Sequence, residues 1–183
     1  MNTPGRTHVK ELLHRGERIN LYQIEVPGRN GSLVKKDLVE HPGAVVILPL
    51  QEDGQVCLIR NWRYSAGEAL WELPAGTLEF GEPTLPAAQR ELQEETGYQA
   101  ERWRLLTEFW VSPGVYGEKM WLYVAQGLTA GTQHLDDTEQ IEPVLLPWQE
   151  AMQMVLQGTI QDAKTLVGLL LWDRLRHETH PSC

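Results

Sequence analysis

The sequence GTLEFGEPTLPAAQRELQEETGY, residues 76–98, decides the fold, because it combines a glycine-bounded loop with an acidic helical segment. The part from Leu85 to Thr96 is predicted to be a helix, since its apolar residues recur at helical spacing. Thr84 is the expected N-cap, and Gly97 lies where a helix commonly ends in a left-handed residue. The segment therefore predicts one well-delimited helix preceded by a loop.

Three glutamates of this helix, Glu91, Glu94 and Glu95, are spaced i, i+3 and i+4 and therefore share one face. Like charges at this spacing destabilise an exposed helix by about 0.2–0.5 kcal/mol per pair. Arg90 can offset one charge, and the remaining oxygens suit magnesium, which takes oxygen ligands and often bridges to substrate phosphates. The alternative interpretation is a solvated acidic face, because charge runs on helices are common.

The wider spacing favours a metal site over a solvated face. Gly76 is followed by Glu82, and residues 90–98 then have the sequence RELQEETGY. This pattern resembles the Nudix box, G-x5-E-x7-R-E-U-x-E-E-x-G-U, where U is a bulky apolar residue; an aliphatic residue is more usual than Tyr98 at the last position. The resemblance implies an α/β (α+β) fold of the Nudix type, an α-β-α sandwich with a mixed central sheet and a small N-terminal β-hairpin extension.

The resemblance also implies a binding site for magnesium, with manganese as a possible substitute. The ion would polarise a diphosphate and lower the pKa of an attacking water molecule. Arg90 would hold the carboxylates by charge-assisted hydrogen bonds, and Glu94 would ligate a further ion or orient its neighbours. The expected metal ligands are the backbone carbonyl of Ala75 and the carboxylates of Glu82, Glu91, Glu94 and Glu95.

Flanking segments narrow the resemblance to the ADP-ribose pyrophosphatase branch of the family. These segments are VEHPGAV at residues 39–45, NWRY at 61–64, ELPAG at 72–76, SPG at 112–114 and GTIQDAKT at 158–165. The branch implies that Arg63 contacts a substrate phosphate and that Pro113 and Gly114 belong to the substrate site. An ordinary structural salt bridge is the alternative for Arg63.

The reaction implied by this branch is the hydrolysis of ADP-ribose to AMP and ribose 5-phosphate. A different nucleoside diphosphate sugar or dinucleotide, such as GDP-mannose, ADP-glucose or a flavin dinucleotide, is the second hypothesis. A catalytically silent module that senses a nucleotide is the third, and the intact set of box carboxylates disfavours it.

An acidic loop, LDDTEQIE at residues 135–142, is expected to supply the residue that activates water. Glu139 is assigned this role because it lies two residues before the strand-like Ile141. The alternative bases are Asp137 and Glu142 in the same loop and Glu118 farther upstream. A solvated acidic loop without a catalytic role is also possible from the sequence.

The N-terminal residues 1–40 are predicted to form a β extension, and residues 41–183 the Nudix domain. Residues 18–26 and 32–39 alternate in polarity around a Pro-Gly-rich turn, which predicts a hairpin. In the resembled branch such a hairpin reaches across a homodimer towards the partner's adenine site. Tyr22 is the nearest aromatic residue for stacking on the base, with Ile19 and Leu21 as alternative positions.

The remaining elements follow from apolar runs. The expected strands are residues 44–50, 55–60, 105–111 and 120–125, and the expected further helices are residues 147–158 and 162–177.

Composition excludes several classes of protein. The formal net charge of −9 argues against general nucleic-acid binding, which needs clustered cationic side chains. No apolar run reaches membrane-spanning length, and the N-terminal region has no signal-peptide pattern. Two cysteines, Cys57 and Cys183, give no disulfide framework or zinc spacing, which favours a reducing cytoplasm. The expected partner is a small nucleotide.

Overall fold

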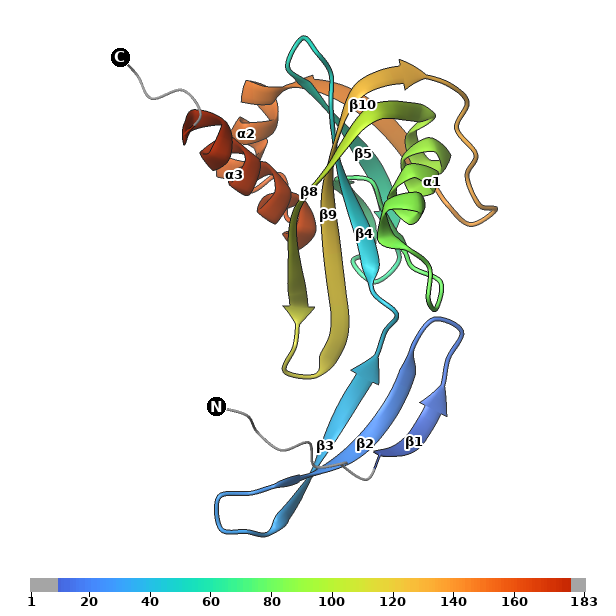
Figure 1. The fold of residues 1–183 in the computed structure, drawn as a ribbon, viewed down its shortest axis with the longest axis vertical. Coiled ribbons are helices and arrows are strands. Elements are labelled where there is room, and N and C mark those ends of the chain that lie inside the picture. Colours follow the sequence, from blue (N-terminus) through green and yellow to red (C-terminus); the bar gives the residue numbers. More distant parts are fainter. Residues whose placement is uncertain (1–9, 179–183) are drawn as a thin grey trace. The chain divides into compact units, whose positions relative to one another are not determined.

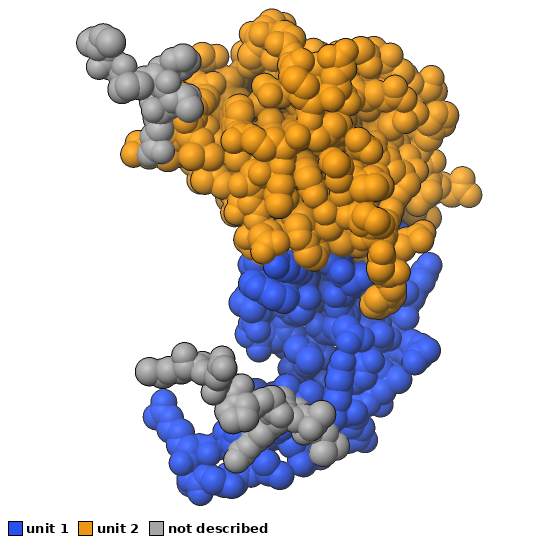
Figure 2. Space-filling view, in the orientation of Figure 1, with its two compact units in different colours: residues 1–43, 110–119 blue, residues 44–109, 120–183 orange. Residues whose placement is uncertain are grey.

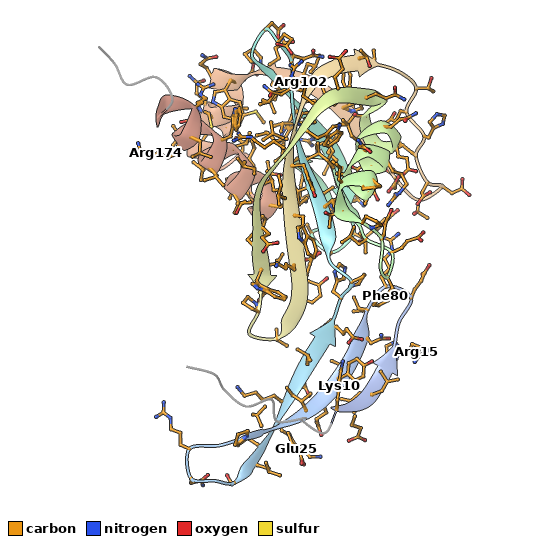
Figure 3. All side chains as sticks on the ribbon, viewed as in Figure 1. Lys10, Arg15, Glu25, Phe80, Arg102 and Arg174 are labelled. Atoms are coloured by element: carbon orange, nitrogen blue, oxygen red, sulfur yellow. The ribbon has the colours of Figure 1, made fainter. Side chains whose placement is uncertain are left out.

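The structure is a computed structural model that describes residues 10–178. The chain divides into two compact units, shown in different colours in Figure 2. Unit 1 contains the described residues up to Gly43 together with Trp110–Lys119. Unit 2 contains Ala44–Phe109 and the chain from Met120 onwards.

Unit 2 is built on a mixed sheet with β4 (Ala44–Leu50) at its centre, a strand that is buried along its whole length. Strand β4 runs parallel to β9 (Tyr116–Ala130) and antiparallel to β5 (Gln55–Arg63) and β7 (Ala75–Thr77). A strand buried on both faces is expected to be a continuous apolar run, as AVVILPL is. Three further strands extend the sheet. Strands β6 (Glu68–Glu72) and β10 (Ile141–Pro147) both pair with β5, and β8 (Tyr98–Ser112) pairs with β9.

Three helices cover the two faces of this sheet. Alternate side chains of β4 point to opposite faces of the sheet. On one face, Val45 and Ile47 pack with α1 (Thr84–Thr96). On the other face, Val46 and Leu48 join the core that includes residues of α2 (Trp148–Leu156) and α3 (Ala163–Glu178). Figure 1 shows α1 on one side of the sheet and α2 and α3 on the other. The predicted α-β-α sandwich is therefore confirmed.

The two ends of α1 test the predicted caps. Gly97 is confirmed as the C-terminal cap: its φ is 75°, and its N–H donates to the carbonyl of Gln93 at 2.8 Å. The predicted N-cap was wrong, because Pro83 occupies that position and Thr84 is already the first helical residue. The Thr84 hydroxyl lies 2.6 Å from the hydroxyl of Tyr123 instead. The hydroxyl that was expected to cap the helix thus forms a hydrogen bond with a residue that is distant in the sequence.

Unit 1 contains a three-stranded antiparallel sheet of β1 (Lys10–Arg15), β2 (Asn20–Pro27) and β3 (Leu33–Glu40). The predicted hairpin is confirmed as β2 and β3. Strand β1 was not predicted, because its sequence KELLHR lacks alternation and its register shifts at a bulge between Leu12 and His14. Among the described residues, unit 1 therefore includes residues 10–40 and also residues 110–119.

Two further sequence features can be compared with the described residues. None of the helices between residues 10 and 178 combines the length and apolar character needed to cross a membrane. Cys57 is a buried free thiol, and burial raises the pKa of this thiol to about 12. Cys183 lies outside the described residues.

Candidate active site

The carboxylate of Glu91 lies directly against the backbone of Gly76. A Cβ atom built at position 76 would be 1.8 Å from Cδ of Glu91, so any side chain there would force the Glu91 carboxylate to move. The neighbouring residue of β7, Ala75, donates its N–H to Oε2 of Glu95 at 2.8 Å. Glu91 and Glu95, from the last two turns of α1, therefore both lie against the backbone of Ala75 and Gly76.

Burial makes these two carboxylates difficult to ionise. Glu95 is 3% exposed, and burial raises its pKa well above the ordinary value, although the Ala75 N–H opposes this. Burial also raises the pKa of Glu91, against the effect of the neighbouring Arg90. The negative charge of Glu139 contributes to both increases in pKa. Both carboxyl groups therefore keep their protons to a higher pH than an exposed glutamate would.

Arg90 joins three of the box carboxylates. Its Nη1 donates to Glu91 at 2.7 Å and to Glu94 at 2.9 Å, and its Nη2 donates to Glu82 at 3.2 Å. Burial lowers the pKa of Arg90, but the surrounding carboxylates outweigh this effect and raise its pKa overall. The guanidinium therefore stays charged and fixes the relative positions of these side chains.

The donor set fits a divalent cation. Among residues 10–178, no three His, Cys, Asp or Glu side chains are already arranged as a metal site. The oxygens of Glu91 and Glu95 are nevertheless hard ligands of the kind that Mg²⁺ prefers, held on a helix and beside a glycine where a side chain would fill the space. Burial raises the pKa of both carboxyl groups, and a cation beside them would oppose that shift.

The acidic loop between β9 and β10 contributes Glu139 to the same region. The half-buried Glu139 accepts a hydrogen bond from the N–H of Asp136 at 3.0 Å. Its charge is among those that most strongly affect Glu91 and Glu95, whereas Asp137 and Glu142 are not among them. Glu118, the other alternative, belongs to unit 1. Glu139 is therefore the loop carboxylate that acts on the box glutamates.

Arg63 forms a salt bridge with a fully buried carboxylate. Its Nε and Nη2 both donate to Glu72 at 2.6 Å, and Lys164 donates to the same carboxylate. Burial raises the pKa of Glu72, but Arg63 and Lys164 outweigh it, so the net shift is downward. Arg63 thus forms the structural salt bridge that was the alternative to its predicted phosphate contact. Its third nitrogen, Nη1, takes no part in the bonds to Glu72.

Lys164 and Asp162 were not singled out from the sequence as individual residues. Lys164 is 7% exposed and also donates to Asp162 at 2.9 Å. Asp162 in turn accepts hydrogen bonds from the N–H and hydroxyl of Thr165 at the start of α3. The signals in the sequence were a single glutamate, Glu72, between Trp71 and Leu73, and the capping pattern Asp-x-x-Thr before an apolar helix.

The other predicted substrate residues belong to unit 1. Tyr22 lies in β2, and the ammonium of Lys10 is 3.7 Å from the centre of its ring. Pro113 and Gly114 lie in the turn between β8 and β9, which is closed by a hydrogen bond from Val115 N to Ser112 O at 3.2 Å. Contact of these residues with a substrate remains a prediction.

Comparison with known proteins identifies the family. The NUDIX domain matches residues 40–167, which is more than half of the chain. The chain belongs to the NUDIX family. The relationship that was predicted from the box at residues 76–98 is therefore confirmed.

Several known proteins are similar to this chain over most of their length. The chain is 35% identical to an ADP-ribose pyrophosphatase of Bacillus subtilis (strain 168) over 166 residues, 90% of each chain. It is 34% identical to a methanol dehydrogenase activator of Bacillus methanolicus over 178 residues, 94% of this chain and 96% of the relative. A solved structure described as an ADP compounds hydrolase has a TM-score of 0.82 at 22% identity and covers 97% of this chain and 98% of that one, which supports the same fold.

The close contact at Gly76 gives a direct test of the NUDIX site. Gly76→Ala is expected to lower the affinity for Mn²⁺ and the hydrolytic activity by about 100-fold each, because the new methyl group displaces the Glu91 carboxylate. Electron paramagnetic resonance of bound Mn²⁺ and a thermal melt measure site and fold separately. Unchanged Mn²⁺ affinity in the folded variant would contradict the proposed ligand role of Glu91.

Proposed function

We propose that this NUDIX protein is a metal-dependent hydrolase that cleaves the diphosphate bond of ADP-ribose to give AMP and ribose 5-phosphate. The observation that supports the reaction best is the convergence of Glu91 and Glu95 on Ala75 and Gly76, with the charge of Glu139 acting on both carboxylates. The substrate is proposed from the ADP-ribose pyrophosphatases of Bacillus subtilis and Mycobacterium tuberculosis, which are each 35% identical to the chain.

The proposed mechanism assigns a role to each residue of the site. Glu91 and Glu95 would hold Mg²⁺, or Mn²⁺ in its place, with the carbonyl of Ala75 as a further ligand, and Glu82 and Glu94 would be available to a second ion. When bound, the metal supplies charge neutralisation of the diphosphate and a lower pKa of the attacking water. Glu139 accepts the proton from that water, and Arg90 keeps the carboxylates in position.

Substrate binding is assigned to four residues. Arg63, held by Glu72 through Nε and Nη2, would offer Nη1 to a phosphate oxygen. Pro113 and Gly114 would line the substrate site, and Tyr22 would stack on the adenine.

A substrate panel tests the proposal. Purified protein with Mg²⁺ or Mn²⁺ is offered ADP-ribose, ADP-glucose, GDP-mannose and a flavin dinucleotide, and kcat/KM is measured for each. ADP-ribose is expected to give the highest value. If another compound exceeds it by about tenfold, equivalent to about 1.4 kcal/mol, the reaction class stands and the substrate assignment fails.

A second candidate function comes from the Bacillus methanolicus relative, whose match spans nearly the full length of both chains. On this proposal the protein activates a methanol dehydrogenase. Adding wild-type protein and the Glu95→Gln variant to a methanol dehydrogenase assay distinguishes activation that needs the metal site from activation by contact alone. Absence of any effect would exclude this candidate.

We also propose that the protein forms a homodimer through unit 1. Unit 1 leaves apolar side chains exposed, a property typical of contact surfaces: Leu12 and Leu13 of β1, Ile19 just before β2, and Leu33 and Val34 of β3 are 41–64% exposed. Leu33→Asp combined with Leu13→Asp is expected to convert dimer to monomer in multi-angle light scattering. The control is Leu156→Asp in α2, a residue that is 81% exposed in unit 2. A wild-type monomer at micromolar concentration would contradict the proposal.

We also propose that the protein acts in the cytoplasm. The support is that Cys57 is a buried free thiol, as expected in a reducing compartment.

A further inference from the structure

The loop that follows β9 caps the C-terminal end of helix α1. His134 donates its N–H to the carbonyl of Glu94 at 2.9 Å, and Gly131 donates its N–H to the carbonyl of Gly97 at 2.7 Å. Between them, the side-chain amide of Gln133 donates to the carbonyl of Glu95 at 2.7 Å. Residues 131–134, here called the capping segment, therefore satisfy carbonyl groups that a helix terminus leaves without intrahelical partners.

Gln133 also contacts the start of β10. Its Nε2 lies 3.2 Å from the carbonyl of Ile141, so one side-chain amide joins α1 to the strand that follows the acidic loop. The far end of that loop is held separately, because Trp62 donates its N–H to the carbonyl of Gln140 at 3.3 Å. Glu139 lies between the capping segment at residues 131–134 and this attachment at Gln140.

The close approach of the capping segment requires glycine on both sides. A Cβ atom at Gly97 would lie 3.0 Å from the backbone nitrogen of Gln133, and one at Gly131 would lie 2.9 Å from the carbonyl oxygen of Gly97. Gly97 thus serves two needs, the left-handed backbone conformation and the passage of the loop. The capping segment packs on the helix too closely for a side chain at either glycine.

Within the acidic loop, the hydrogen bonds around Glu139 are local. Its N–H donates to Asp136 O, and its Oε2 accepts from Asp136 N, both at 3.0 Å. These bonds define the turn but do not attach it to the helix. The placement of this turn relative to Glu91 and Glu95 therefore depends on the attachments at its two ends.

We propose that Gln133 is a positioning residue for catalysis: by joining Glu95 O to Ile141 O, it sets the distance between Glu139 and the box carboxylates. The inference rests on the proposed role of Glu139 as the base. Misplacing a reacting group by about 1 Å can lower the rate by about 100-fold, so loss of a contact that joins the two ends of this loop is expected to lower the rate.

The test replaces Gln133 by Leu, which has a similar size but no amide. The expected result is a fall of about tenfold or more in kcat for ADP-ribose, with KM changed by less than about twofold, as for partners of active-site groups. Gln133→Met retains the length of the side chain and provides a second variant if Gln133→Leu does not fold. The matched control is Gln99→Leu, which removes an exposed hydrogen bond to Gln93 on the same helix.

A double-variant cycle separates positioning from a general structural effect. In a Glu139→Gln background, Gln133→Leu is expected to cause no further fall in kcat, because the group that it positions has lost its function. Losses that multiply in full, or a wild-type kcat for Gln133→Leu, would overturn the inference. An unchanged kcat for Glu139→Gln would instead refute the proposed base, so the two failures are distinguishable.

Discussion

Glu95→Gln is expected to lower the hydrolysis of ADP-ribose by about 10³-fold, equivalent to about 4 kcal/mol of transition-state stabilisation. Glutamine retains the size of the side chain and can still accept the Ala75 N–H, so the local backbone should be preserved. What it removes is a negatively charged ligand oxygen beside the diphosphate. The measurement is kcat/KM with saturating Mg²⁺, and retention of activity within about tenfold would contradict the metal site.

The same substitution is expected to stabilise the metal-free protein at neutral pH. Burial raises the pKa of Glu95 in the folded state above its ordinary value of 4.5, which applies to the unfolded chain. The stability linked to the protonated carboxyl is complete below the unfolded pKa and is lost as pH rises through the raised folded pKa. Ionised Glu95 therefore opposes folding at higher pH, and glutamine removes that cost.

Thermal melts between pH 4 and 9 in the presence of a chelator test this sign. The Tm of wild type should fall relative to that of Glu95→Gln as pH rises, and Mg²⁺ should reduce the difference by binding only wild type tightly. The control is Glu101→Gln in β8, whose side chain is 72% exposed. A Glu95→Gln protein that is less stable than wild type at neutral pH without metal would show that the raised pKa is not a source of strain.

Lys164→Met is expected to give the largest loss of stability, about 3–5 kcal/mol of unfolding free energy. Glu72 is fully buried and charged, and its carboxylate depends on both Arg63 and Lys164. Methionine fills a similar volume but leaves part of this charge uncompensated in the interior. Urea unfolding followed by circular dichroism measures the effect, because the linear extrapolation reports the free energy directly.

Two controls interpret the Lys164 result. Lys36→Met removes an exposed lysine of β3 and should change the unfolding free energy by less than about 0.5 kcal/mol. Adding Glu72→Gln to Lys164→Met removes the buried charge that has lost one of its two cationic partners, so the double variant should be more stable than Lys164→Met alone. A loss below about 1 kcal/mol for Lys164→Met would mean that Arg63 alone compensates Glu72.

Features set by neighbouring residues could be predicted from the sequence. The extent of α1, the left-handed cap at Gly97 and the shared face of Glu91 and Glu95 all follow from contacts within a few residues along one helix. The buried central strand β4 was also predictable, because a continuous apolar run has few other positions in a folded domain. Gly76 was identified from motif spacing, and the structure adds the physical cause, the adjacent carboxylate of Glu91.

Strand β1 and the N-terminus of α1 show where local patterns fail. The β1 sequence has no alternation because both its faces are exposed, so hydrophobic periodicity could not reveal it. The Thr84 hydroxyl met the local requirements for a cap, but Tyr123, 39 residues away in the chain, binds it instead. At β1 the usual burial signal is absent, and at the start of α1 the deciding partner is distant in the sequence.

The order of residues alone was enough for the family and the acidic helix, because both depend on short-range spacing in residues 76–98. Folding in three dimensions decided the pairing of Glu72 with Lys164 across 92 positions, and the attachment of the Glu139 loop to α1 through Gln133. The reason is physical: a buried charge or amide is stable only beside a partner, and the partner's position depends on how the whole chain packs.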